Sequence, residues 1–375
     1  MKILLLGEYS NVHATLAEGL RALGHDVTVV SDGDGWKDYP RDINLRRRSL
    51  SIGGTVRYIF DVARVWPKLK GFDVVQLINP VMLELKGERI WPFYEYLRKH
   101  NGKMVMGAFG IDHYWVKVGM DGTSFRYSDF HISGQPRHNS YNNEMIATWL
   151  NGSKGEVNLR IADDCDLIVS GLYENHVTYQ PYHADKLHFI PFPINTASVT
   201  PSALYPTPSE LSTLPVAPPI KFFIGIQRTR SEYKGTDIML RALERLHHDY
   251  PTLVSVERAE SVPFAQYQQM LSSSHVLLDQ LYSYTPAMNA LMAMAKGMIV
   301  VGGGEPEQYE LINEYKLRPI VNVLPSEDSV YDQMLTLLVR QPCHIHQLQL
   351  DSMEYIHRHH DHVKVARQYE QLYKL

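Results

Sequence analysis

The stretch that most constrains the fold is residues 276–297, which read VLLDQLYSYTPAMNALMAMAKG. An apolar run ends at Asp279, a short polar loop follows, and a helix is predicted over Pro286–Ala295. Thr285 suits the N-cap because its hydroxyl can accept a free backbone N–H, and Pro286 suits the first helical position because it has no N–H. A Lys-Gly pair then marks the helix end. A strand leading directly into a helix N-terminus presents free N–H groups and positive charge, so the stretch predicts a phosphate site.

Short apolar runs and amphipathic helical segments alternate in both halves of the chain. In the first half, strands are expected at Lys2–Leu6, Asp26–Ser31, Phe72–Ile78, Lys103–Ala108, Asp166–Ser170 and Leu187–Pro191. In the second half, they are expected at Ile220–Ile226, Thr252–Val256, His275–Asp279 and Met298–Val301. This alternation is typical of doubly wound parallel sheets. The sequence therefore predicts an α/β protein with two Rossmann-like domains facing across a cleft.

A proline-rich stretch separates the two series of strands. Neither a helix nor a central strand persists through Pro201, Pro206, Pro208, Pro215, Pro218 and Pro219. We therefore expect a first domain at 1–198, a linker at 199–219 and a second domain at 220–351. A closing helix over 352–375 is expected to pack back on the first domain.

Composition excludes several classes of protein. Apolar residues make up 44% and charged residues 21% of the chain, which is normal for a globular protein. The net charge of −4 gives no footprint for nucleic acid. Cys165 and Cys343 are far apart and form no disulfide framework or metal-type spacing. The N-terminal MKILLLGEYS looks like a buried strand, and no apolar run is long enough to span a bilayer. A cytoplasmic protein is expected.

A basic loop follows the first predicted strand of the second half of the chain. Residues 224–235 read IGIQRTRSEYKG, beginning on a strand and ending at the start of a helix. Arg228 and Lys234 therefore lie at the carboxyl edge of the sheet, where open α/β folds place ligands. A guanidinium and an ammonium there are suited to a diphosphate, although an ordinary charged surface loop has the same composition.

At this point the chain resembles a family. The order strand, Arg228, Lys234-Gly235, helix, then strand, loop, Ala293–Gly297, strand is similar to the nucleotide-sugar domain of retaining GT-B glycosyltransferases. The segment HFIPFPIN at 188–195 is similar to the turn these enzymes carry before their linker. The resemblance implies that Arg228 and Lys234 contact a donor diphosphate. It also implies transfer of a sugar from a nucleotide-diphosphate sugar to a glycan or lipid-linked acceptor, with retention, in surface polysaccharide synthesis.

The chain departs from the family at two positions. Where the family carries two glutamates eight residues apart, this chain has Tyr284 and Met292. The nearby polar groups that are candidates to substitute are Asp279, Asn289, Glu305 and Glu307. Two interpretations stay open: an enzyme with rewired donor contacts, or a protein that binds nucleotide sugar without turnover.

The donor site is expected to gather residues from several loops. Tyr284 and Thr285 are expected at the diphosphate. The sugar or nucleoside is expected to contact Asn289, Met292, Val262, Gly304 and Glu305, the last two following three glycines that permit a close backbone approach.

Two turns of the first domain also carry candidates. GAFGIDHYW at 107–115 follows a strand, and Asp112 and His113 are expected to face the cleft as catalytic groups, since histidine titrates near neutrality. A purely structural pair is the alternative. Gly7 and Asn11 lie in the first strand–helix turn and are expected on the acceptor side.

Residues 41–70 hold eight basic and two acidic residues, with apolar residues at helical spacing. A basic amphipathic helix suits an anionic bilayer surface, so peripheral membrane contact is one interpretation. A core helix with a solvated basic face is the other.

Three alternatives to sugar transfer remain. A nucleotide-sugar 2-epimerase would need acids around the sugar. A nicotinamide-dependent oxidoreductase could use Asp32 for a ribose, but the first turn lacks Gly-x-Gly-x-x-Gly. A non-catalytic nucleotide-sugar-binding protein is suggested by Tyr284 and Met292. No metal site and no cofactor beyond the sugar nucleotide are expected.

Overall fold

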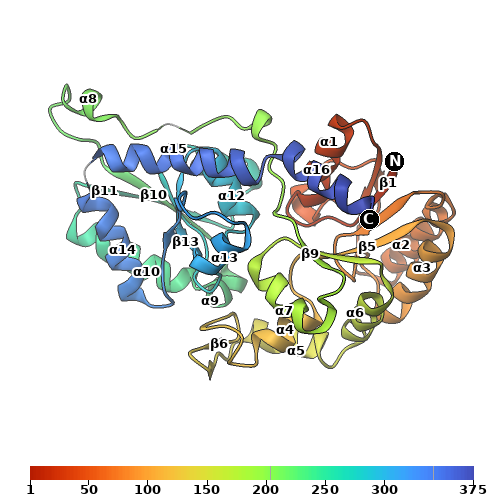
Figure 1. Cartoon of the computed structure of the whole chain (residues 1–375). Helices are drawn as coiled ribbons and strands as arrows, with labels where there is room; N and C mark the ends of the chain where they lie inside the picture. The colour runs from red at the N-terminus through yellow and green to blue at the C-terminus, as the bar shows by residue number, and fades with distance from the viewer. Residues whose placement is uncertain (203, 341) are drawn as a thin grey trace. The chain divides into compact units, whose positions relative to one another are not determined.

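The computed structural model describes residues 1–202, 204–340 and 342–375, without the side chains of Phe264, Pro342 and Cys343. Ala203 of the expected linker and Gln341 of the expected second domain lie outside this description. The chain forms two compact units (Figure 1). The first unit comprises Met1–Asp121, Asn143–Asn195 and Asp361–Leu375, and the second comprises Gly122–Asn142 and Thr196–His360.

The first unit is built on a seven-stranded parallel sheet in the order β3-β2-β1-β4-β5-β8-β9. Its strands are β1 (Lys2–Leu6), β2 (Asp26–Ser31), β3 (Ile43–Asn44), β4 (Val74–Leu77), β5 (Lys103–Ala108), β8 (Leu167–Ser170) and β9 (Leu187–Phe189). Its helices are α1 (Val12–Ala22), α2 (Ile52–Val65), α3 (Gly87–His100), α4 (His113–Gly119), α6 (Ser153–Asp164), α7 (Tyr173–His183) and α16 (His362–Tyr373). Short 3-10 turns lie at η1 (Gly35–Lys37), η2 (Trp66–Lys68) and, in the second unit, η3 (Thr196–Ser198).

The second unit has a five-stranded parallel sheet in the order β11-β10-β12-β13-β14. Its strands are β10 (Ile220–Ile226), β11 (Val254–Glu260), β12 (Val276–Leu278), β13 (Ile299–Gly302) and β14 (Val321–Asn322), with a separate pair β6 (His131–Ile132) and β7 (Gln135–Pro136). Its helices are α8 (Pro208–Leu211), α9 (Ser231–Lys234), α10 (Thr236–Asp249), α11 (Phe264–Ser272), α12 (Met288–Ala295), α13 (Pro306–Leu311), α14 (Glu327–Val339) and α15 (Pro342–His359), with the turn η4 (Arg228–Arg230). Helix α5 (Ser140–Trp149) runs from the second unit into the first.

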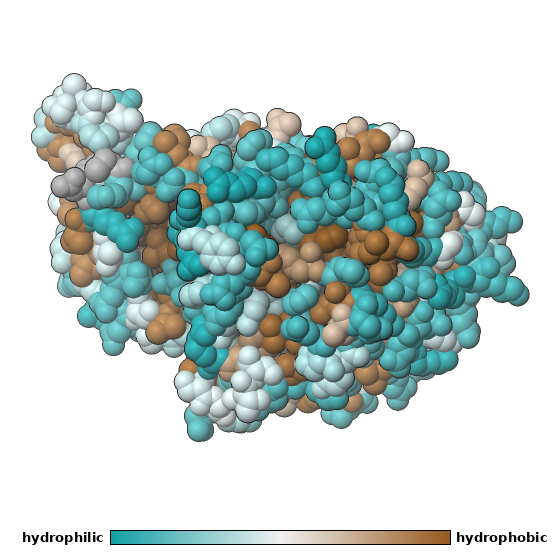
Figure 2. Space-filling model, viewed as in Figure 1, coloured by the Kyte–Doolittle hydropathy of each residue, from teal (hydrophilic) through white to brown (hydrophobic). Residues whose placement is uncertain are grey.

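Every residue of β4, β8, β12 and β13 is buried. Strands buried along their whole length belong to parallel sheets with both faces covered, which is what the apolar runs of the sequence predict. Each unit has its own apolar core around its sheet. Hydrophilic residues cover most of the face seen in Figure 2.

The C-terminal segment is two helices where one was expected over 352–375. Helix α15 belongs to the second unit and α16 to the first. The helical conformation is interrupted between them at His360–Asp361. Asp361 caps α16 by accepting the backbone N–H groups of Val363 and Lys364. Helix α16 packs on α1.

The units also divide the chain differently from the expected domains. Residues 122–142, placed in the first domain by the sequence, are part of the second unit. The expected linker 199–219 likewise falls in the second unit, where Tyr205 is buried and its hydroxyl donates to the Pro218 carbonyl at 2.8 Å.

Candidate active site

Three loops follow β10, β12 and β13 at the carboxyl edge of the second sheet. The loop after β10 carries Arg228 and Lys234, the loop after β12 carries Tyr284, and the loop after β13 carries Glu305. Because parallel strands end at the same edge, the sheet gathers these loops at one place.

Lys234 lies close enough to Asp279 to act on its charge, and the two loops are joined by a hydrogen bond from the Leu281 N–H to the Lys234 carbonyl at 2.9 Å. Burial raises the pKa of Asp279, and the positive charge of Lys234 partly offsets that rise. Asn289 donates to Asp279 at 2.8 Å and accepts the Tyr267 hydroxyl at 3.0 Å. The Lys234 ammonium therefore lies within electrostatic reach of Asp279, which Asn289 on the first turn of α12 contacts.

The expected cap of this helix is wrong in detail. Helix α12 begins at Met288, with Ala287 at the N-cap and no side-chain cap, so neither Thr285 nor Pro286 has its expected helical position. The loop continues two residues further than expected, and Thr285 is buried within it. The end of the helix is as expected, with Gly297 at φ +83°.

Arg228 has a different partner from Lys234. Its side chain is 78% exposed and its guanidinium pairs with Glu260 at the end of β11. Glu260 also accepts from Arg258 at 2.7 Å. As the structure stands, Arg228 therefore contacts a carboxylate rather than joining Lys234.

Tyr284 is a packed side chain. It is 2% exposed, lies against the rings of Phe125 and Tyr127 at centroid distances of 5.6 and 4.9 Å, and its hydroxyl accepts the Arg126 N–H at 2.8 Å. The expectation that Tyr284 contacts a diphosphate is not met by this arrangement, because the ring is covered.

Glu305 is also engaged. Its carboxylate accepts the Tyr127 hydroxyl at 2.6 Å and the Arg126 guanidinium at 2.7 Å, and its side chain is 5% exposed. Gly304 is packed closely, since a Cβ there would lie 2.8 Å from the Ile320 side chain. Both residues therefore have packing partners where sugar contacts were expected.

The remaining donor candidates are less constrained. Met292 is half-buried on α12, one turn after Asn289, and Val262 is half-buried in the loop between β11 and α11. Asn289 alone among the expected sugar or nucleoside residues joins the Lys234–Asp279 cluster.

In the first unit, Asp112 has a structural role. It is fully buried, caps α4 by accepting the Trp115 N–H at 2.9 Å, and accepts the Tyr179 hydroxyl at 2.6 Å. Burial raises its pKa to about 6. The expectation of a catalytic carboxylate facing a cleft is therefore wrong for Asp112, because a helix terminus and a buried phenol already occupy its oxygens.

His113 is held in the same way. Its ring Nδ1 bonds the Trp149 carbonyl at 2.9 Å, its backbone N–H donates to Asn158, and burial lowers its pKa. The bond fixes the proton on Nδ1, since a carbonyl can only accept. The imidazole is thus anchored within the first unit.

A cavity of about 440 Å³ lies where β1, β2 and β4 end in the first unit. Its lining includes four acids and three bases: Glu8, Asp32, Asp34, Glu84, Arg47, Lys86 and Lys154. Gly7 also lines it and has φ +87°, and a Cβ there would meet Ile78 at 2.2 Å. Gly7 is thus required by the turn itself. Asn11, at φ 73°, is the N-cap of α1 without a side-chain cap.

Glu8 is a residue that the sequence did not single out. Its carboxylate accepts the N–H groups of His13 and Ala14 at the start of α1, at 3.2 and 2.8 Å. Burial raises its pKa to about 8. The signal was present, because an acid shortly before a helix is a common partner for free N–H groups.

Comparison with solved structures supports the topology described above. No protein-family model and no curated protein matches the chain. Sucrose-phosphate synthase from Thermosynechococcus elongatus matches with a TM-score of 0.59 and 14% identity over 100% of this chain and 98% of that one. HepE of Anabaena in complex with UDP-glucose matches with a TM-score of 0.57 and 14% identity over the whole of both chains. A putative UDP-N-acetylglucosamine 2-epimerase from Listeria monocytogenes matches with a TM-score of 0.54 and 11% identity over 98% and 94%.

The chain has the GT-B glycosyltransferase fold. The expected pair of Rossmann-like sheets and the return of the final helix to the first unit are confirmed. At these identities the likeness establishes the fold and leaves the activity to be argued from the site.

Within this GT-B fold, no helix among the described residues is long and apolar enough to cross a membrane. The described histidines, cysteines and carboxylates also form no group of three suited to a metal ion.

Two further site residues were missed by sequence reasoning. Arg126 and Tyr127 come from residues 122–142 in the first half of the sequence, yet they contact Tyr284 and Glu305 of the second unit. Their partners lie 158 and 178 positions away, so no local pattern signals the contact.

Proposed function

We propose that the protein is a glycosyltransferase that moves a sugar from a nucleotide-diphosphate sugar to an acceptor hydroxyl with retention. The observation that carries the proposal is Lys234 beside Asp279 and Asn289 at the first turn of α12. An ammonium and free helix N–H groups are suited to hold a leaving diphosphate. The likeness to HepE bound to UDP-glucose supports a sugar nucleotide as the ligand.

The proposed reaction breaks the bond between the sugar and the diphosphate. Negative charge grows on the departing phosphate oxygen, and Lys234 with the α12 N-terminus would stabilise it. We propose that these groups do this without a metal ion, and that the departing phosphate oxygen takes the acceptor proton. No cofactor other than the sugar nucleotide enters this scheme.

The absent glutamates bear on the nature of the donor contacts. Asn289 lies one turn before Met292 on α12. Glu305 lies beside Tyr284, because the Glu305 backbone N–H donates to the Tyr284 carbonyl at 3.1 Å. Of these two polar groups, Asn289 joins the Lys234–Asp279 cluster near Met292, whereas Glu305 is held by Arg126 and Tyr127. This supports an enzyme with rewired donor contacts over a protein that only binds.

A 2-epimerase is the second candidate, favoured by one observation. The fold of a putative UDP-N-acetylglucosamine 2-epimerase matches along almost the whole chain. Both functions need a nucleotide-diphosphate site, so the product distinguishes them.

A ligand screen followed by a product assay tests the proposal. We expect UDP or GDP to raise the melting temperature of the full chain and NAD to leave it unchanged. Incubation with UDP- and GDP-sugars and glycan or lipid-linked acceptors should then yield a new glycosidic bond. Stabilisation by NAD alone would indicate an oxidoreductase. Formation of a 2-epimer of the sugar nucleotide when no acceptor is present would indicate an epimerase.

We further propose that the acceptor side works at the inner face of a membrane, in surface polysaccharide synthesis. Helix α2 buries Tyr58 and Val62, while Ile52, Val56 and Phe60 are 87%, 62% and 66% exposed. These three recur every four residues and so share one helix face. Five arginines lie on or next to the helix: Arg46, Arg47, Arg48, Arg57 and Arg64. An exposed apolar stripe among cations suits an anionic bilayer.

Co-sedimentation with vesicles tests this membrane contact. We expect the full chain to bind phosphatidylglycerol vesicles better than phosphatidylcholine vesicles. The double variant Val56→Ser with Phe60→Ser should bind about tenfold more weakly, because it removes inserted apolar surface. Val216→Ser, at a residue 78% exposed in the second unit, is the matched control and should bind like the wild type. Equal binding by all three proteins would remove the proposal.

A further inference from the structure

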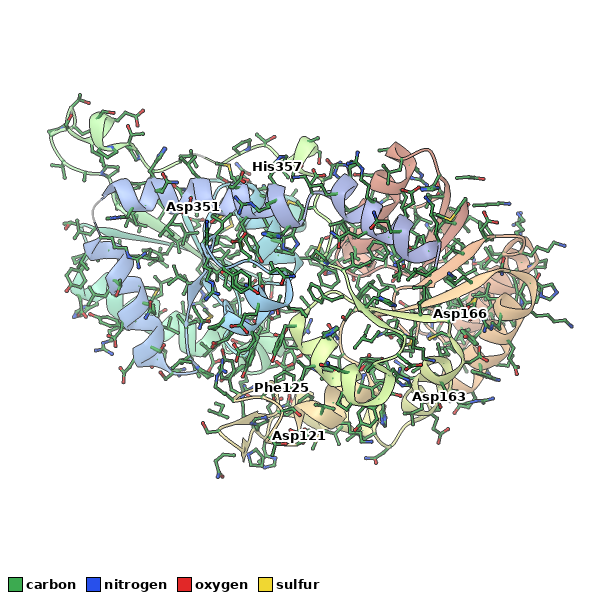
Figure 3. All side chains as sticks on the ribbon, in the orientation of Figure 1. Asp121, Phe125, Asp163, Asp166, Asp351 and His357 are labelled. Atoms are coloured by element: carbon green, nitrogen blue, oxygen red, sulfur yellow. The ribbon has the colours of Figure 1, made fainter. Side chains whose placement is uncertain are left out.

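Residues Gly122–Asn142, here called the hairpin segment, leave the first unit after α4 and are part of the second unit. Figure 3 labels Asp121, the residue just before the segment, and Phe125 within it. The strands β6 and β7 pair antiparallel within it, joining His131 to Pro136 and Ile132 to Gln135. Four of its aromatic residues are at most 7% exposed: Phe125, Tyr127, Phe130 and His131. A segment with so many buried rings is a fixed part of the second unit.

One end of the hairpin segment is fastened to the loops after β12 and β13. The Arg126 N–H donates to the Tyr284 hydroxyl, and its guanidinium pairs with both Glu305 and Glu307. The guanidinium also lies 5.0 Å from the Tyr284 ring centroid. Because the Arg126 guanidinium pairs with two neighbouring carboxylates, it is the main electrostatic link at this end.

The other end is fastened to the loops after β10 and β12. Asp129 accepts the Tyr233 hydroxyl at 2.8 Å, and Arg137 donates to the Glu232 carbonyl at 2.6 Å. The Arg137 guanidinium also lies 3.3 Å from the ring centroid of Tyr282. The hairpin segment thus contacts all three loops of the candidate donor site, including the residue just before Lys234.

We propose that Arg126 is a positioning residue of the donor site, which holds the three loops in one arrangement through the hairpin segment. The inference rests on the proposed function, because it assigns the loops to a nucleotide-diphosphate sugar. It also gives a reason for Tyr284 at the position where similar glycosyltransferases carry a glutamate: this side chain anchors Arg126 instead of meeting the donor. Arg126 acts through the hairpin segment, whose Asp129 accepts the hydroxyl of Tyr233 next to Lys234, and it is a positioning rather than a catalytic residue.

Hydrogen exchange on the full chain measures the bracing directly. We expect Arg126→Ala to speed backbone exchange about tenfold in residues 279–287 and also in 227–235, which Arg126 does not contact. Arg126→Lys keeps the positive charge but cannot form the two-pronged contact of a guanidinium. Its exchange rates should therefore lie between those of Arg126→Ala and the wild type. Arg241→Ala is the matched control: Arg241 is 53% exposed against 54% for Arg126, and it also joins two acids, Asp237 and Glu327.

Binding of UDP and GDP to the same variants provides the second readout. Whichever of the two nucleotides binds the wild type, we expect Arg126→Ala to bind it about tenfold more weakly. The affinity of Arg241→Ala should equal that of the wild type. Unchanged exchange in 227–235, or unchanged nucleotide affinity with faster exchange, would overturn the positioning role. If exchange responds as expected but the wild type binds neither nucleotide, the proposed function fails while the bracing by Arg126 stands.

Discussion

At the scale of single residues, charge partners decide which basic side chains are ready for an anion. Arg228 is mostly exposed and already paired with Glu260, whereas Lys234 stands beside the buried Asp279 and its neighbour Asn289. The sequence made the two residues equivalent, because both follow the same strand. Only the structure shows that they face different partners.

The first prediction compares these two residues. Lys234→Ala should lower kcat/KM for sugar transfer by about a hundredfold, because it removes the ammonium proposed to stabilise the leaving diphosphate. Arg228→Ala should lower it by about threefold at most, since that guanidinium pairs with Glu260. Steady-state kinetics with the donor identified in the product assay provides the measurement. Equal losses would show that Arg228 swings into the site, and matched melting temperatures would confirm that both variants fold.

The second prediction concerns pH and Glu8. Burial raises the pKa of Glu8 from 4.5 to about 8, so the folded state favours the protonated carboxyl. Its contribution to stability is complete below pH 4.5 and is lost as the pH rises towards 8. Glu8→Gln removes this titration. The stability of the variant relative to the wild type should therefore rise by about 2 kcal/mol between pH 5 and 8.

Urea unfolding at several pH values measures this difference. Glu244→Gln, on the exposed side of α10, is the control and should leave the pH profile of the wild type unchanged. A Glu8→Gln profile parallel to the wild type would mean that Glu8 ionises as freely in the folded protein as in the unfolded one.

At the scale of elements, helix packing explains why certain glycines are needed. Gly19 lies on α1, and a Cβ there would be 2.3 Å from the His362 carbonyl oxygen and 2.9 Å from the Ala366 side chain. The α1–α16 contact is therefore close enough to exclude even a methyl group. Gly53 on α2 has nothing within 4 Å of such a Cβ.

The third prediction uses this matched pair. Gly19→Ala should lower the free energy of unfolding by about 1–3 kcal/mol, because α16 must shift to admit the methyl group. Gly53→Ala should raise it by about 0.5 kcal/mol through the lower entropy of the unfolded chain. Urea denaturation of both variants gives the two values. A stabilised Gly19→Ala would mean that the two helices separate without cost.

The elements also show how far the sequence alone could reach. Apolar runs located the central strands, because strands covered on both faces are mostly apolar, with the buried Gln76 of β4 as an exception. The start of α12 was misplaced, since Thr285 and Pro286 satisfy the local capping rules but the buried loop extends past them. Asp112 was assigned to catalysis because an acid after a strand suits both a site and a helix cap. The hairpin segment was missed because its strands are two residues long and its partners are distant in sequence.

At the scale of the whole molecule, the chain passes between the two units more than once. Residues 122–142 add to the second unit from the first half of the chain, and residues 361–375 return to the first. Helix α16 buries Val365, Ala366, Tyr369, Leu372 and Tyr373. The Tyr373 hydroxyl donates to Gln76 at 2.7 Å, at the centre of the first sheet.

The fourth prediction follows from this return. Deletion of residues 361–375 should expose the apolar face of α1 and destabilise the first unit by several kcal/mol, while the second unit keeps its own core. Hydrogen exchange should become rapid in β1 and β4 and stay slow in β10 and β12. Slow exchange in β1 of the shortened chain would show that α16 contributes little to the stability of the first unit.

The interleaving of the two units has a consequence for synthesis in the cell. A ribosome delivers residues in order, and a domain made of one continuous stretch can fold as soon as it emerges. Here the first sheet waits for α16, which emerges only after the whole second sheet has been made. Nascent chains must therefore hold a nearly complete first sheet with one helix face uncovered, which makes this protein a natural client for chaperones that shield apolar surface during translation.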